Sequence, residues 1–265
     1  MTDTVLAGMT LPHHPPAMVM WAAEYAARTG NPLRVILSRA GRCNPDPAMR
    51  AVRSAVAGVG ARYPAPPLRL TLDPRPLFSA FADVPDAGLV LVDRDAHRWS
   101  AIRGLATRRA GPVAAVGADS WWTQKVQPLL VGTDGTASSE PALEWAFAAA
   151  DCIGCGVRVV FSPAAATESA KLRESMLTTV TALTAHHRAL DVRLHSRDSS
   201  LLEALSWHSQ SASMTVLGPR NGTVTAATER VLLRSNCAIV LVPQRGAAPT
   251  ANRSTMDSRV LPRHA

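Results

Sequence analysis

Features that define three other classes of protein are missing from this sequence. No apolar run approaches the roughly 18 residues that a membrane span needs. The four cysteines lack the spacing of a disulfide framework, and no secretory segment opens the chain. No G-x-S-x-G or G-x4-G-K-S/T string occurs, and the acidic residues are scattered rather than paired. We therefore expect a soluble, cytoplasmic protein that is not an enzyme and has no membrane partner.

Positive charge is in excess, but its arrangement does not indicate a nucleic-acid partner. Lys and Arg outnumber Asp and Glu by 28 to 20, which gives a net charge of +8 and a pI near 10.3. Much of the excess lies in two stretches, 94–109 and 245–263. No basic motif with interleaved aromatic residues accompanies them. The pattern is typical of a solvated basic face followed by a basic tail.

An internal repeat with a spacing of 124 residues is the strongest signal that is present. About forty residues align without a gap, and the spacing of 124 residues exceeds the roughly 20–50-residue periods of solenoids, so each copy should be a whole domain. We assign residues 1–120 to a first half, 125–246 to a second half and 247–265 to a disordered basic tail, with linker sequence around 117–127. The matched pairs are Gly8 with Gly132, Trp21 with Trp145, Arg34 with Arg158 and Arg69 with Arg193.

Each half alternates short apolar runs with helical patterns, which predicts a parallel sheet covered on both faces. The expected strands are 5–8, 33–37, 68–72, 89–92 and 113–116, then 126–131, 157–161, 192–194, 214–217 and 238–242. The expected helices are 18–28, 48–63, 76–81 and 101–108, then 142–150, 168–190, 201–208 and 225–234. We thus predict an α/β protein with two tandem, doubly wound, Rossmann-like domains, each with a five-stranded parallel sheet.

The first strand of the second half leads into a turn and a capped helix. The turn reads Val131-Gly132-Thr133-Asp134-Gly135-Thr136, and the last strand reads Cys237-Ala238-Ile239-Val240-Leu241-Val242-Pro243. Ser139 and Pro141 suit the start of the intervening helix, and Gly154 suits its end. With these landmarks the chain resembles a tandem universal stress protein. The resemblance implies that the two domains pack about a pseudo-twofold axis through their last strands.

The resemblance also implies a nucleotide site in the second half. In nucleotide-binding members the Asp after the first strand contacts the ribose region, and a Gly-x2-Gly-x9-Gly-Ser/Thr loop after the fourth strand holds the phosphates, because glycines allow close backbone approach. The loop here departs from that pattern: Asn221 replaces the second Gly, Thr225-Ala226 replaces Gly-Ser, and Gly218 to Ala238 spans 20 positions, about six fewer. The residues that could still serve are Gly132, Asp134, Gly218, Arg220, Gly222, Thr223 and Thr225.

The first half departs further from the nucleotide-binding pattern. Thr10 stands where the second half has Asp134, and the fourth strand ends in Asp93, whose carboxylate would repel phosphates. Trp99-Ser100 occupies the position of the Gly-Ser pair. We expect no ATP in this half.

Three other groups of residues invite a functional interpretation. Cys152 and Cys155 have redox spacing, but the pair lies at the end of a helix rather than at its start, and a zinc site would need further ligands. The pairs His13-His14 and His186-His187 have no carboxylate at a matching helical step, so we predict surface histidines and no metal. The pair Trp121-Trp122 in the linker is predicted to pack between the domains.

Together these patterns predict a regulatory or scaffold protein of the stress response that acts through protein partners and binds ATP weakly or not at all. An adenine-nucleotide sensor that uses the second half to bind ATP or AMP is the alternative. A third class is thiol-based redox sensing through Cys152 and Cys155. The sequence names no partner and leaves open a homodimer in addition to the internal pair of domains.

Overall fold

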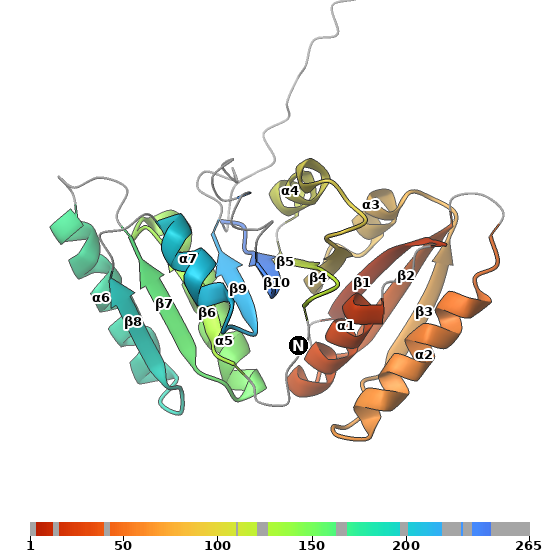
Figure 1. The fold of residues 1–265 in the computed structure, drawn as a ribbon, viewed down its shortest axis with the longest axis horizontal. Helices are drawn as coiled ribbons and strands as arrows, with labels where there is room; N and C mark the ends of the chain where they lie inside the picture. Colours follow the sequence, from red (N-terminus) through yellow and green to blue (C-terminus); the bar gives the residue numbers. More distant parts are fainter. Residues whose placement is uncertain are drawn as a thin grey trace, which may run out of the picture.

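The computed structural model describes residues 4–12, 16–39, 43–109, 111–120, 127–162, 169–196, 201–218, 229 and 235–244. These residues form one ten-stranded sheet in the order β3-β2-β1-β4-β5-β10-β9-β6-β7-β8 (Figure 1). The strands of the first half are β1 (Thr4–Leu11), β2 (Leu33–Arg39), β3 (Leu68–Asp73), β4 (Ala87–Asp93) and β5 (Val113–Val116). Those of the second half are β6 (Leu129–Thr133), β7 (Val157–Phe161), β8 (Val192–Ser196), β9 (Met214–Leu217) and β10 (Ala238–Leu241).

Helices cover both faces of this sheet, each over its own buried apolar core. On one face lie α1 (Pro16–Thr29), α2 (Asp46–Gly60), α5 (Glu140–Ile153) and α6 (Ser169–His186). On the other lie α3 (Leu77–Ala80), η1 (Phe81–Asp83), α4 (Trp99–Arg108) and α7 (Leu201–Ser209), while η2 (Ala137–Ser139) leads into α5. The predicted doubly wound α/β architecture is confirmed.

Several predicted boundaries differ from the observed ones for local reasons. The helix expected at 48–63 begins at Asp46, since Pro47 fits the first helical turn. This helix ends at Gly60. The helix expected at 168–190 ends at His186, and Leu190 packs on the core from the turn that follows. The first strand extends beyond 5–8 to Leu11, whose side chain is buried. Of the helix predicted at 225–234, only Glu229 lies within the described residues.

The repeat read from the sequence is also a repeat of strand register. Gly8 pairs with Ile36 between β1 and β2, and Gly132 pairs with Val160 between β6 and β7, so both partners are shifted by 124 positions. Arg34 pairs with Arg69, and Arg158 pairs with Arg193 in the same way. The two halves therefore present equivalent residues at equivalent places on their sheets.

The two halves join through their last strands, as the resemblance implies. Ile239 of β10 pairs with Ala115 of β5, and this pairing is antiparallel, whereas the other pairings of the sheet are parallel. Arg94, which follows β4, crosses the junction and donates from Nη1 to the carbonyl oxygen of Ser235 at 2.7 Å. Gly117 makes room for this guanidinium, because a Cβ there would overlap it.

Aromatic rings fill the junction on the α1 and α5 side. Tyr25 stacks on Trp21 with ring centroids 5.3 Å apart, and on Trp145 of the second half at 6.5 Å. Trp145 is thus part of the contact between the halves, and Trp21 packs behind the Tyr25 ring that Trp145 meets. The pair Trp121-Trp122, which was predicted to pack there, lies outside the described residues. None of the described helices combines the length and the apolarity that crossing a bilayer requires.

Candidate functional site

The candidate site of the second half begins at the turn after β6, where Asp134 lies at the carboxyl edge of the sheet. Its Oδ1 accepts hydrogen bonds from the backbone nitrogen of Thr136 at 3.1 Å and from the hydroxyl of Thr136 at 2.6 Å. This oxygen is therefore directed back over its own turn, as in an Asx turn. A ligand that contacts Oδ1 must share it with Thr136.

Hydroxyl groups hold the rest of this turn in place. The backbone nitrogen of Gly135, at a φ of 79°, donates to Thr133 Oγ1 at 3.0 Å. Thr133 Oγ1 lies 2.7 Å from Ser139 Oγ, which also donates to the carbonyl of Thr136 at 2.8 Å. Ser139 does precede α5, but its side chain bonds this turn rather than a helix amide. The sequence did not predict this network because nothing in the chain order shows which hydroxyls meet.

The glycines predicted to approach a nucleotide are needed for packing within the chain. A Cβ on Gly132 would lie 2.7 Å from Leu217 and 2.9 Å from Leu205. A Cβ on Gly218 would lie 2.8 Å from the carbonyl oxygen of Ser138. Gly218 therefore lets the end of β9 close onto the turn that contains Asp134. The structure therefore brings Asp134 and Gly218 together at one edge of the sheet, while Gly132 lies beneath α7.

Four further residues after β9 are predicted to contact a nucleotide. Arg220, Gly222, Thr223 and Thr225 lie outside the described residues.

The equivalent edge of the first half carries an acidic residue that is already engaged. Asp93 at the end of β4 is buried, and its Oδ1 accepts a hydrogen bond from the backbone nitrogen of Asp95 at 2.9 Å. Burial lowers the pKa of His97, with the charge of Asp93 acting in the opposite direction. The expectation that this half takes no ATP stays a prediction.

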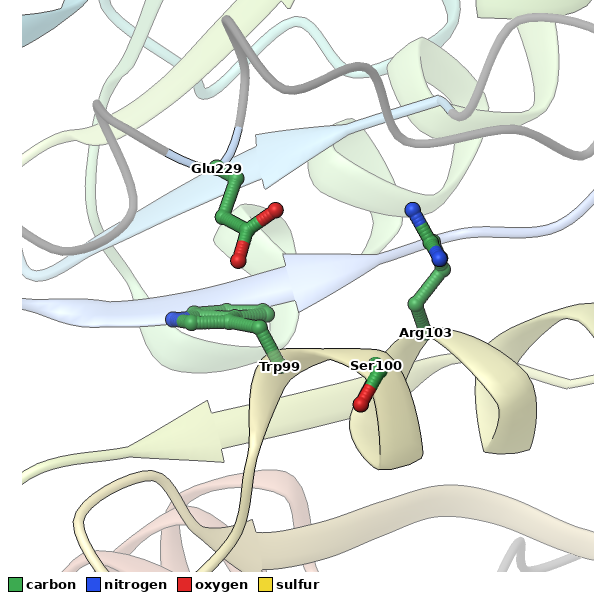
Figure 2. Close-up of a pocket in the computed structure, with 4 residues that line it drawn as sticks. All are labelled: Trp99, Ser100, Arg103 and Glu229. Atoms are coloured by element: carbon green, nitrogen blue, oxygen red, sulfur yellow. The ribbon is translucent and has the colours of Figure 1, made fainter.

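A small cavity lies where α4 of the first half faces the second half (Figure 2). Trp99, Ser100 and Arg103 line it from α4, and the carboxylate of Glu229 lies above the indole ring of Trp99. Its volume is about 40 Å³. Because one water molecule needs about 10–15 Å³ of such space, this volume suits a few water molecules rather than a nucleotide.

The two spaced cysteines form part of a helix end. Gly154 ends α5 in the left-handed conformation, at a φ of 76°. Burial raises the pKa of the Cys155 thiol to about 11, whereas Cys152 is exposed. Both thiols are free, as are those of Cys43 and Cys237. A protonated, buried thiol is a poor nucleophile, so this arrangement does not favour redox sensing through the pair.

The histidine pair of the second half has a neighbour that its sequence spacing did not reveal. Nδ1 of His187 lies 3.0 Å from Oδ2 of Asp151 on α5, and its ring packs beside Phe147. The spacing argument concerned carboxylates at a matching step of the same helix, and Asp151 comes from a different helix. Within the described part of the chain no three His, Cys, Asp or Glu residues gather around a possible metal position. His13 and His14 lie outside that part.

This chain is similar to known proteins in its structure rather than in its sequence. No model of a protein family matches the sequence, and no curated protein matches it. Among the solved structures that are similar to this chain, three match over most of their own length. A universal stress protein from Archaeoglobus fulgidus DSM 4304 is 14% identical with a TM-score of 0.66, covering 92% of this chain and 99% of its own.

Two further structures come from Pseudomonas aeruginosa. A functionally unknown protein from strain PAO1 is 13% identical with a TM-score of 0.64, covering 92% of this chain and 93% of its own. A putative universal stress protein from strain UCBPP-PA14 is 14% identical with a TM-score of 0.64, covering 91% of this chain and 93% of its own. The chain therefore has the fold of universal stress proteins across both of its halves.

Proposed function

We propose that this chain is a cytoplasmic regulatory or scaffold protein of the universal stress protein type. It acts through protein partners, binds adenine nucleotides weakly or not at all, and carries out no chemistry of its own. The proposal combines the fold with the state of the two sites that a nucleotide would need.

The observation that carries the proposal is the engagement of the carboxylate of Asp134. Its Oδ1 already accepts two hydrogen bonds from Thr136, and Gly218 is used to pack against the turn at Ser138. The first half offers Thr10 in place of that Asp and the carboxylate of Asp93 where phosphates would lie. In both halves, the predicted contact groups that lie within the described residues are thus replaced or committed to internal contacts.

A role in protein binding is supported by an exposed aromatic side chain. Trp207 on α7 is 72% exposed, which is unusual for an aromatic residue of this size. Exposed Trp side chains are frequent anchors of protein interfaces.

The alternative function is sensing of an adenine nucleotide by the second half. It is favoured by one observation: the turn of Asp134 and the end of β9 at Gly218 are adjacent at the carboxyl edge, where open α/β sheets bind ligands. The two functions differ in whether nucleotide binding depends on Asp134.

Calorimetric titration of ATP and AMP into the purified chain and into an Asp134→Ala variant tests the proposal. We expect no saturable heat at nucleotide concentrations up to about 1 mM, which corresponds to a binding free energy weaker than about 4 kcal/mol. Saturable binding that the variant loses would overturn the proposal in favour of the nucleotide sensor. A thermal shift with ATP, ADP, AMP and cyclic AMP gives an independent readout.

A further inference from the structure

A second cavity lies at the opposite edge of the first half, at the amino ends of its parallel strands. It has a volume of about 250 Å³ and opens between the starts of β1, β2 and β3. Its apolar walls are Pro32, Pro67, Leu68 and Val84. Two arginines, Arg34 of β2 and Arg69 of β3, also line it, together with Thr4 and Leu33. No residue of the Asp134 turn belongs to it.

The two arginines are neighbours on one face of the sheet. They are partners in the register of β2 and β3, so their side chains project from adjacent positions. Arg34 Nε is fully buried and has no hydrogen-bond partner. Across the described ranges neither guanidinium makes a hydrogen bond or an ion pair. A buried donor of a charged group without a partner is costly, so this arrangement favours an anion from outside the chain.

The second half shows how the same pair is satisfied internally. Arg158 stands 124 positions after Arg34, and its Nη1 donates to Ser211 Oγ at 3.0 Å. Arg193 stands 124 positions after Arg69, and its Nη2 lies 3.0 Å from Oδ2 of Asp191. The position that corresponds to Asp191 in the first half is Pro67. The first half therefore keeps both arginines and lacks the carboxylate.

We propose that this cavity binds a small organic anion, with its carboxylate or phosphate held by the guanidinium groups of Arg34 and Arg69. Guanidinium groups match the geometry of both oxyanions through paired hydrogen bonds. The apolar walls at Pro32, Pro67 and Val84 receive a compact apolar group next to the anion. The cavity is slightly smaller than the roughly 300–1,000 Å³ of sites for drug-sized ligands, which limits the ligand to a compact molecule. The site is separate from the proposed function, because it lies at the other edge of the sheet.

Calorimetric titration of benzoate and of phenyl phosphate tests the site. These probes share an aromatic ring and differ in the anionic group. We expect saturable binding of at least one, and the tighter probe identifies the preferred oxyanion. Arg34→Gln and Arg69→Gln should each weaken that binding at least tenfold. Absence of saturable binding of both probes at about 10 mM, a free energy of only about 3 kcal/mol, overturns the proposal. Undiminished binding by Arg34→Gln overturns it too.

The second half supplies matched controls for these variants. Arg158→Gln and Arg193→Gln change the corresponding residues and should leave probe binding within twofold of the unaltered chain. Pro67→Asp introduces the carboxylate that the second half has, and should compete with the probe and weaken it at least tenfold. Thermal unfolding followed by circular dichroism establishes that each variant is folded. Equal losses in Arg158→Gln, or unchanged affinity in folded Pro67→Asp, contradict the assignment.

Discussion

The two halves of this chain share the packing around their central strand glycines and differ in where they place charged side chains. Gly8 and Gly132 occupy the same register position. Gly8 lies against the ring of Phe81, and Gly132 lies against the side chain of Leu205. At the carboxyl edge, by contrast, the second half has Asp134 where the first has Thr10. The shared fold thus fixes the packing around these glycines, whereas the side chains at the carboxyl edge of the sheet differ in charge.

The ion cluster of the first half has no equivalent in the second. Glu24 Oε1 lies 2.7 Å from Arg28 Nη2, and both side chains are less than 10% exposed, while Arg62 adds a longer contact at 3.5 Å. The corresponding residues of the second half are Ala148 and Cys152. The cluster therefore tests whether the first half depends on a buried charge pair that the second half lacks.

The largest expected effect comes from Glu24→Ala. It leaves the Arg28 guanidinium buried without its carboxylate and should lower the free energy of unfolding by about 3 kcal/mol. Urea unfolding monitored by circular dichroism gives this value. Arg62→Ala is the control, because Arg62 is 49% exposed at its side chain, and it should cost less than about 0.5 kcal/mol. Similar losses in the two variants would show that Glu24 does not act through a buried pair.

The next effect separates the two equivalent strand glycines. A Cβ on Gly8 would overlap the rigid ring of Phe81, whereas one on Gly132 would meet the flexible ends of Leu217 and Leu205. Gly8→Ala should therefore cost about 2 kcal/mol and Gly132→Ala about 1 kcal/mol or less. Both are measured from the midpoints of urea unfolding. A greater loss in the second half would reverse the proposed order of packing tightness.

A third pair of variants should show no difference between the halves. Gly30 and Gly154 follow α1 and α5 at φ values of 67° and 76°, and neither has an atom within 4 Å of an added Cβ. Gly30→Ala and Gly154→Ala should each lower the unfolding free energy by about 1 kcal/mol, because only the left-handed backbone is penalised. Unequal values from thermal unfolding would mean that the two helix ends differ in more than conformation.

The smallest effect is a pH dependence that belongs to the first half. Hydrogen bonds from Arg75 lower the pKa of Asp73 from 3.8 to about 2. Since the folded-state pKa is depressed, the stabilisation is present above about pH 4 and is lost as the pH falls toward 2. NMR titration of the Asp73 carboxyl should give this low value, and Arg75→Gln should return it toward 3.8. A pKa that Arg75→Gln leaves unchanged would assign the shift to another cause.

Much of the fold was predictable because apolar periodicity and a repeat of 124 residues both depend on chain order. The candidate site was predictable only in part. Asp134 and Gly218 were predicted from the resemblance to universal stress proteins, and they meet because parallel strands bring their carboxyl ends to one edge. The hydrogen bonds between the hydroxyls of Thr133 and Ser139 were not predicted, because a Thr or Ser in a sequence does not indicate which group its hydroxyl will contact.

The sequence by itself determined the α/β class, the duplication and the order of strands and helices, because these follow from local periodicity and from residues matched along the chain. Only the tertiary structure decided which groups are already satisfied. It shows that Asp134 bonds Thr136 and that Cys155 is buried. Within the described residues, it also shows that Arg34 Nε has no hydrogen-bond partner while Arg158 has one. The physical reason is that hydrogen bonding and burial depend on distances between residues far apart in the chain, and periodicity carries no information about those distances.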